Sequence, residues 1–314
     1  MLEKITMQKE KNLTVKEGFE LFLRKCRVKN LTEVSIRSYE QKLKLFFVYL
    51  GEDSLLHCIS SDVVENYVLW LRENYRCGDI TINSYLRSVR AFLYYCMDCD
   101  YIKRFKVEMI KAEKPLKETY STEELEKLLK KPDVHNCKFS EFKARAFANY
   151  LIGTGNRISS AVNLKIKDIS FEDGVIYLRH TKNRKQQIIP LSKTLADVLT
   201  EYLEFRGGTE DDYVFCDSWG NKSKAVTYTR LMYDYNISRN VNKTGCHLFR
   251  HTFAKNWILA GGDVFRLQKI LGHSDISVTK EYVQMFGADL QMDFERYNPL
   301  DRLYLKTHRE KIKM

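Results

Sequence analysis

The sequence predicts a mainly helical chain in two blocks, with one small antiparallel sheet in the second block. Apolar residues recur at helical spacing through most of the chain, whereas a short stretch after residue 170 alternates with period two. Only 14 glycines and 4 prolines occur among the 314 residues, which favours long helices over many short strands. A chain of this length suggests about two domains.

The first hundred residues are predicted to form four helices. The first begins after Thr14, which forms a capping box with Glu17. The second begins near residue 32 and ends at Gly51, and the third begins near residue 61. After Gly78, the fourth begins at Thr81 and carries a stripe of apolar residues at i, i+4, i+7 and i+11.

A basic segment with little periodicity follows, from Lys103 to Lys117. We interpret it as an interdomain linker with the boundary near Pro115, because it lies between two periodic blocks. A run of charge is most often a solvated surface, and a tether to the DNA backbone is the alternative.

The second block is predicted to open with a capping box formed by Ser121 and Glu124. Asp173–Gly174 is a hairpin turn signal, and the period-two pattern predicts strands over 175–179 and 187–191. Ser277 is expected to cap the last helix. The predicted helices of this block cover 122–131, 139–152, a short stretch through 162, 193–205, 226–236, 247–260, 264–271 and 278–286.

Composition narrows the class of protein. The net charge of +11 favours a polyanionic partner, with nucleic acid ahead of a membrane surface. No apolar run approaches the roughly 20 residues of a membrane span, and the first residues show no signal-peptide core, so we expect a cytoplasmic protein. The eight scattered cysteines indicate reduced thiols. Cys96 and Cys99, even with His135 and Cys137, match no zinc-module spacing.

Three cationic side chains share one face of a predicted helix. His247, Arg250 and His251 stand at i, i+3 and i+4, with apolar residues such as Phe249 and Phe253 around them. A solvated helix surface is the ordinary explanation of such a group. A half-buried helix must pair its cations, however, and few carboxylates are nearby in sequence, so a phosphate would fit.

Other polar residues are unremarkable one by one but form an ordered series. They are the Gly-x-Arg-Ile-Ser block at 155–159, the strand-turn block at 180–191, the His-x-x-Arg-His-Thr-Phe-Ala block at 247–254, the Leu-Gly-His-Ser block at 271–274, and Tyr282. In this order and spacing, residues 150–283 resemble the catalytic domain of the tyrosine recombinases, the phage integrase family. The helices before Pro115 resemble the family's core-binding domain.

The resemblance implies a role for each matching residue. Arg157 and Arg250 would bind the scissile phosphate, and Tyr282 would attack phosphorus to form a 3′-phosphotyrosyl link. His247 would accept a proton, Lys182 would protonate the leaving 5′ oxygen, and His273 would hydrogen-bond the phosphate.

Two positions depart from the family's frequent residues. Residue 156 is Asn rather than Leu, and Ser160 stands where an acidic residue is common. Neither removes a catalytic group, and the resemblance implies no metal or other cofactor.

The predicted organisation is a helical core-binding domain over 1–110, a basic linker over 111–118, a catalytic domain over 119–298 and a charged tail over 299–314. Arg87, Arg90, Lys111 and Lys114 are candidates for DNA phosphate contacts. The resemblance implies a homotetramer on two double-stranded DNA sites, accessory DNA-bending or directionality proteins, and a nucleoid-associated location. The tail is expected to pack on a neighbouring protomer.

The predicted function is site-specific recombination for a mobile genetic element. The alternatives are Xer-like resolution of chromosome or plasmid dimers, a type IB topoisomerase, and a DNA-binding protein without catalysis.

Overall fold

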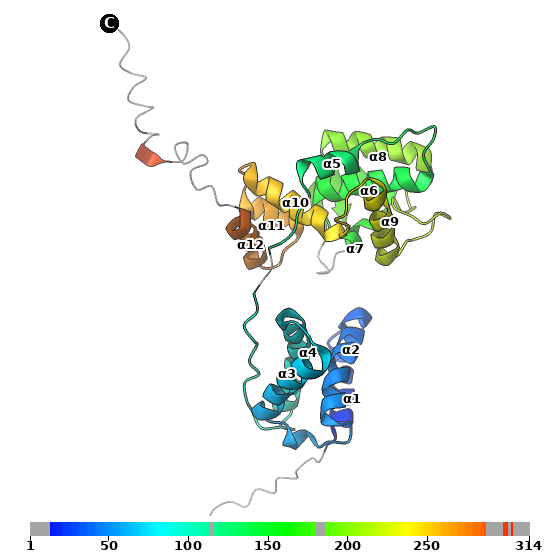
Figure 1. Ribbon diagram of the computed structural model, residues 1–314. Coiled ribbons are helices and arrows are strands. Elements are labelled where there is room, and N and C mark those ends of the chain that lie inside the picture. The colour runs from blue at the N-terminus through cyan, green and yellow to red at the C-terminus, as the bar shows by residue number, and fades with distance from the viewer. Residues whose placement is uncertain (1–12, 114–115, 180–185, 287–297, 301–302, 304–314) are drawn as a thin grey trace, which may run out of the picture. The chain divides into compact units, whose positions relative to one another are not determined.

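The computed structural model describes residues 13–113, 116–179, 186–286, 298–300 and 303 (Figure 1). It is mainly helical with one small sheet, so the predicted fold class is confirmed. The chain divides between Pro115 and Leu116 into two compact units, called here the first and the second unit. Among the described residues, no helix is long and apolar enough to cross a lipid bilayer.

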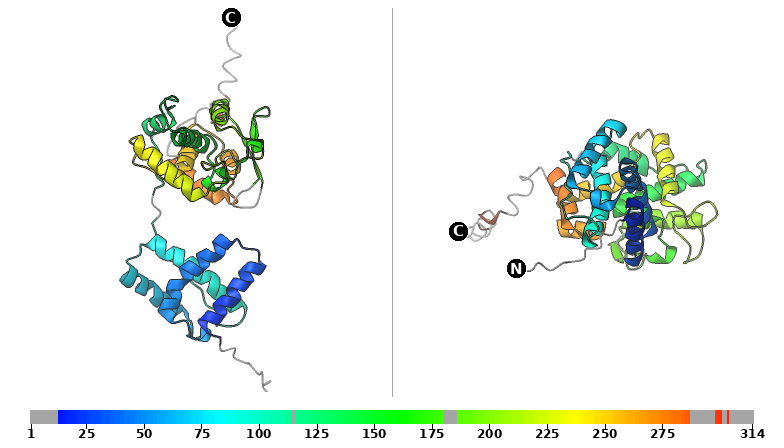
Figure 2. Two further views of the ribbon diagram at one scale, coloured as in Figure 1. Left: turned by 90° about the vertical axis from the view of Figure 1, so that its right-hand side faces the viewer. Right: turned by 90° about the horizontal axis from the view of Figure 1, so that it is seen from below.

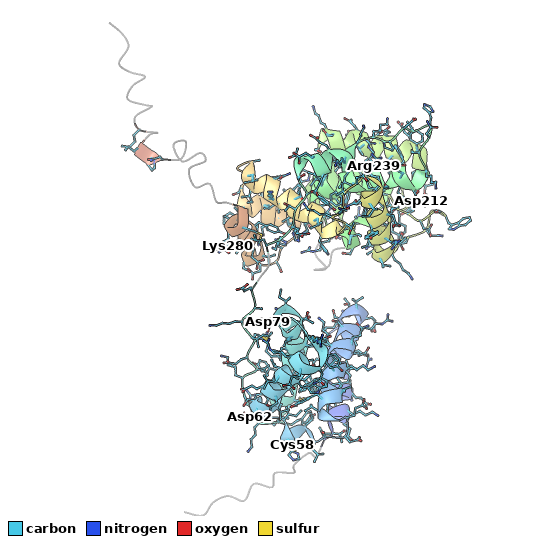
Figure 3. The ribbon with its side chains drawn as sticks, viewed as in Figure 1. Cys58, Asp62, Asp79, Asp212, Arg239 and Lys280 are labelled. Carbon is cyan, nitrogen blue, oxygen red and sulfur yellow. The ribbon has the colours of Figure 1, made fainter. Side chains whose placement is uncertain are left out.

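The first unit contains four long helices that cross one another (Figure 2). The predicted capping box is present at the N-terminus of the first helix, where the side chains of Thr14 and Glu17 each accept a hydrogen bond from the other's backbone N–H. Asp79 (labelled in Figure 3) opens the fourth helix, two residues before the predicted start, and pairs with Arg72 at 2.7 Å. The helices are α1 (Val15–Val28), α2 (Glu33–Leu50), α3 (Ser61–Tyr75) and α4 (Asp79–Asp98).

An aromatic cluster forms the centre of the first unit. The rings of Phe22 and Phe47 each meet Phe92 edge-on, with centroids 5.7 Å apart in both pairs. Phe92 is completely buried on α4. Such edge-to-face pairs add about 0.5–1.5 kcal/mol beyond the burial of apolar surface.

The first half of the basic segment packs on the first unit. Ile102 and Val107 are buried in its core. The Asn83 side chain binds both backbone groups of Ile110, donating to its carbonyl at 2.8 Å and accepting from its N–H at 3.1 Å. The segment forms no helix or strand over 103–113, as predicted, and its contacts with the first unit extend to Ile110.

The second unit is built around helix α6, which contacts α8, α9 and α10. Phe147 and Tyr150 of α6 are fully buried among other aromatic rings. Arg239 (labelled in Figure 3) ties the end of α9 to Glu141 of α6 at 2.7 Å. The helices are α5 (Thr122–Leu129), α6 (Phe139–Thr154), α7 (Ile158–Ala161), α8 (Lys193–Arg206), α9 (Ala225–Ser238), α10 (Cys246–Leu259), α11 (Val264–Leu271) and α12 (Ile276–Phe286).

The sheet has the antiparallel order β1-β2-β3. Its strands are β1 (Ile169–Ser170), β2 (Val175–Leu178) and β3 (Gln187–Pro190). Gly174 takes a φ of +62° in the predicted turn, and Ile176 pairs with Ile169 on one side and Ile189 on the other. The capping box of Ser121 and Glu124 is present as predicted.

The start of the last helix corrects one prediction. Helix α12 begins at Ile276, so Ser277 lies inside its first turn and is not the cap. The carboxylate of Asp275 instead accepts from the backbone N–H of Ser277 at 2.8 Å. Asp and Ser are both good capping residues, so local sequence did not decide between them.

Candidate active site

Arg250 lies at the bottom of the site, with 5% of its surface exposed. From α10 its guanidinium donates to the carbonyl of Gly155 at 2.9 Å and to that of Leu271 at 2.8 Å. Its Nη2 also lies 2.7 Å from Nε2 of His273. Burial, followed by the charge of Arg157, lowers the pKa of Arg250 to about 10, so the group remains charged at neutral pH.

A tight turn brings Arg157 to the same place. Gly155 ends α6 with a φ of +63°, and Arg157 then caps the short helix α7. Nη1 of Arg157 donates to the carbonyl of Leu271 at 3.4 Å, the same oxygen that Arg250 binds. A Cβ at Gly155 would lie 2.6 Å from Phe253 and 2.9 Å from Leu271, so glycine permits this close packing.

His273 follows Gly272, which ends α11 in the left-handed conformation. Its Nδ1 lies 2.8 Å from Oγ1 of Thr279, and its Nε2 faces Arg250. Burial, followed by Arg250 and Arg157, lowers the pKa of His273 to about 4, so the ring is neutral at pH 7. Because a guanidinium only donates, Nε2 accepts and Nδ1 carries the proton that is donated to Thr279.

Tyr282 lies on α12 with 2% of its surface exposed. Its hydroxyl is 2.8 Å from Nδ1 of His251, and its ring is nearly parallel to that of His273, with centroids 6.4 Å apart. Lys117 lies 4.1 Å from the ring centroid and pairs with Glu281 at 3.0 Å. Burial raises the pKa of Tyr282, and Arg250 acts in the opposite direction.

A pocket of about 430 Å³ opens in front of the two arginines. Its walls come from the α6–α7 turn, β3, α10 and the end of α11, and Tyr282 is not among its lining residues. Three cationic side chains, Arg157, Arg250 and Lys269, line the pocket, so it suits an anion of the size of a phosphodiester. The lining residues are Asn156, Arg157, Ser160, Gln186, Gln187, Ile188, Arg250, Lys269, Leu271, Gly272, His273 and Ser274.

The structure explains one of the two departures from the family pattern. The Asn156 side chain is buried and donates to the hydroxyl of Tyr150 at 2.8 Å, which anchors the turn before Arg157. Ser160 is buried beside the pocket.

The structure does not bring the remaining described candidates into this pocket. Lys182 and Lys114 fall outside the described residues. His247 is exposed at the start of α10. In the first unit, the side chains of Arg87 and Lys111 are exposed and that of Arg90 is partly buried.

Sequence reasoning gave no role to two residues that contact Tyr282. The sequence indicates His251 only as the third member of a cationic face, and Lys117 only as part of a basic run. The position of His251 directly after Arg250 on the same helix is a sequence signal that His251 lies near the site. No local pattern indicates the contact of Lys117 with Tyr282, because it joins residues 165 positions apart.

The chain matches two protein-family models. Residues 118–287 match the model described as phage integrase family, and residues 14–114 match that of the phage integrase SAM-like domain. Tyrosine recombinase XerD of Staphylococcus haemolyticus is 26% identical over 282 residues, which cover 86% of this chain and 94% of the relative. The XerD protein of Staphylococcus aureus is 23% identical with the same coverage.

Solved structures share the fold. The Tn1549 transposon integrase in complex with transposon right-end DNA matches with a TM-score of 0.70 at 21% identity, over 91% of this chain and 99% of that one. A lambda integrase tetramer bound to a Holliday junction matches with a TM-score of 0.68 at 16% identity, over 86% of this chain and 80% of that one.

Proposed function

The chain belongs to the phage integrase family of tyrosine recombinases, enzymes that cleave and join DNA, and we propose that it recombines specific DNA sites with Tyr282 as its nucleophile. The observation that carries this proposal is the convergence of both guanidinium groups. Arg157 and Arg250 bind the same carbonyl oxygen, and Arg250 also bonds to the tyrosine. Two adjacent cations at one pocket are stabilised when an anion binds between them.

We propose the following reaction at this site. The scissile phosphate binds the two guanidiniums, which stabilise the charge that grows on its non-bridging oxygens. The oxygen of Tyr282 forms a bond to phosphorus, and the bond from phosphorus to the 5′ oxygen breaks. The 5′ oxygen keeps that electron pair and takes a proton, for which we propose Lys182 as the donor. A 5′ hydroxyl of another strand reverses the step and joins the strands.

We propose that this activity serves a mobile genetic element, acting as a homotetramer on two DNA sites with accessory proteins. A related fold is seen in the Tn1549 integrase in complex with its transposon right-end DNA. Xer-like dimer resolution is the second candidate, because the curated relatives are named XerD.

Covalent capture on DNA tests the proposal. The protein is incubated with sheared source DNA, denatured in SDS, and the attached DNA is sequenced, with Tyr282→Phe as the test variant. Tyr233→Phe is the matched control, since it removes a hydroxyl from a tyrosine with 44% of its surface exposed. We expect an adduct with the wild type and the control and none with Tyr282→Phe.

The same experiment separates the alternatives. An adduct that survives in Tyr282→Phe excludes this nucleophile, and DNA binding without any adduct favours a non-catalytic DNA-binding protein. If the attached DNA comes from the ends of a mobile element, the mobile-element role is supported. If it comes from a single chromosomal site, dimer resolution is supported. Strand exchange between two captured sites excludes a topoisomerase.

A further inference from the structure

The imidazole of His251 lies in direct contact with the reacting atom of Tyr282, its phenol oxygen. Its Nδ1 lies 2.8 Å from the phenol oxygen, with the two ring centroids 5.8 Å apart and the planes inclined by 45°. Resting on the function proposed above, we propose that His251 is the catalytic base that takes the phenol proton while Tyr282 attacks phosphorus. The sequence analysis gave this role to His247, whose side chain is exposed one helical turn earlier.

The position of His251 on α10 connects the base to phosphate binding. Arg250 is the preceding residue, so one helix turn presents both the guanidinium and the imidazole. Arg250 also hydrogen-bonds the tyrosine, and because a guanidinium has no acceptor it can bind only the lone pairs of the phenol oxygen. An unprotonated Nδ1 beside this oxygen accepts the phenol hydrogen.

The surroundings keep this imidazole neutral before DNA binds. Burial, followed by the charges of Lys117, His247 and Arg250, lowers the pKa of His251 to about 4. Of the elements packed against it, α12 contributes Tyr282 and Glu281, and the segment before α5 contributes Lys117, which pairs with Glu281. Nδ1 is therefore free to accept at neutral pH.

Bound phosphate would strengthen the base at the moment it is needed. In the free protein the phenol keeps its proton, because burial raises the pKa of Tyr282, and burial followed by neighbouring cations lowers that of His251. A scissile phosphate neutralises those cations and adds negative charge beside the ring, which favours the imidazolium. The tyrosine is thus activated only when a phosphate occupies the pocket.

Each proton and electron pair of the cleavage step has a defined destination. The proton passes from the Tyr282 oxygen to Nδ1 of His251, and the freed electron pair forms the bond to phosphorus. The bond from phosphorus to the 5′ oxygen breaks, and that oxygen is protonated by the separate donor. In strand joining the imidazolium returns its proton to the departing phenolate.

Single-turnover adduct formation on captured DNA tests the proposal with two variants. His251→Asn keeps a hydrogen-bond acceptor near the position of Nδ1 but cannot hold a proton, and His251→Ala removes both properties. His135→Asn is the matched control, because His135 is an exposed histidine of the same unit. We expect both His251 variants to form the adduct about 10²-fold more slowly or worse, and the control to match the wild type.

Two readouts separate a base from a structural group. The wild-type rate should stay nearly level from pH 6 to 8, whereas the Asn variant should gain about tenfold per pH unit because it depends on free phenolate. On DNA whose 5′-bridging oxygen is replaced by sulfur, the leaving thiol needs no proton donor. The defect of the His251 variants should persist there.

Several outcomes would overturn the proposal while leaving the recombinase function intact. Recovery of the Asn variant to within threefold of wild type would show a positioning role, and parallel pH profiles would show that His251 takes no proton. If the His251 variants formed the adduct at the wild-type rate on the sulfur substrate, His251 would be identified as the proton donor to the leaving group. Failure of the wild type itself to form an adduct would instead overturn the proposed function.

Discussion

Arg250 is a buried cation whose described partners are two carbonyl oxygens, an imidazole nitrogen and the hydroxyl of Tyr282, and none of them is a carboxylate. A carboxylate partner would neutralise the guanidinium and compete with DNA for it. Carbonyl dipoles satisfy the N–H groups and leave the positive charge available. The sequence analysis expects a phosphate to balance this charge, and the carbonyl oxygens of Gly155 and Leu271 hold the guanidinium in position for it.

We predict that Arg250→Lys slows adduct formation about 10²-fold while weakening DNA binding much less. An ammonium is a point charge and cannot reproduce the planar fork that reaches Gly155, Leu271 and the phosphate together. Single-turnover capture and a gel-shift titration measure the two effects. Arg266→Lys, an exposed position on α11, is the control, and cleavage by Arg250→Lys at the control's rate would contradict the prediction.

Two neutral histidines make the second unit sensitive to acid. His251 and His273 have pKa values lowered to about 4, against an ordinary value of 6.5. Below pH 6.5 the unfolded chain binds protons that the folded chain refuses until about pH 4, so stability falls across this window.

We therefore expect a melting temperature roughly 3 °C lower or more at pH 5 than at pH 7. Calorimetry on the wild type and on the double variant His251→Asn/His273→Asn measures the effect. The melting temperature of the double variant should decrease less between pH 7 and pH 5 than that of the wild type. An equal decrease in both proteins would show that other groups cause it.

At the scale of elements, two glycine turns place the site. Gly155 ends α6 and Gly272 ends α11, both with φ near +62°, and each is followed within two residues by a polar group of the site. A Cβ at Gly272 would lie 2.7 Å from Gln187, whose amide donates to the carbonyl of Ile270 at 2.6 Å. These contacts join α11 to β3.

We predict that Gly155→Ala destabilises the second unit by roughly 1–3 kcal/mol and slows cleavage. The left-handed backbone and the contacts with Phe253 and Leu271 both oppose a Cβ. Urea denaturation compares it with Gly245→Ala, where φ is −76° and the nearest atom would lie 3.6 Å away. Equal stability of the two variants would contradict the prediction.

Sequence patterns predicted the elements well because their signals are local. Apolar stripes and capping boxes such as Thr14 with Glu17 depend on residues a few positions apart. The start of α12 was missed because Asp275 and Ser277 compete as caps. The contact of His251 with Tyr282 joins residues 31 positions apart, so it required the packing of α10 on α12.

At the scale of the whole molecule, a net charge of +11 should make DNA binding strongly dependent on salt. We predict that Arg87→Ala and Lys111→Ala each reduce the slope of log affinity against log salt by about 0.9, the effect of one lost phosphate contact. Fluorescence anisotropy on the captured duplex from 50 to 200 mM salt measures it. Arg72→Ala is the control, because Asp79 already pairs with Arg72.

An unchanged slope in Arg87→Ala or Lys111→Ala would remove that residue from the DNA interface. A slope that falls equally in Arg72→Ala would show a general charge effect and no specific contact.

The ribosome completes the first unit long before it makes Tyr282. At about 5–20 residues per second, on the order of ten to thirty seconds separate Pro115 from the tyrosine, and domains generally fold as units, N-terminal first. Both arginines of the pocket are also translated before α12. Chains that terminate before residue 282 lack the proposed nucleophile, so we expect them to be unable to form the covalent link to DNA.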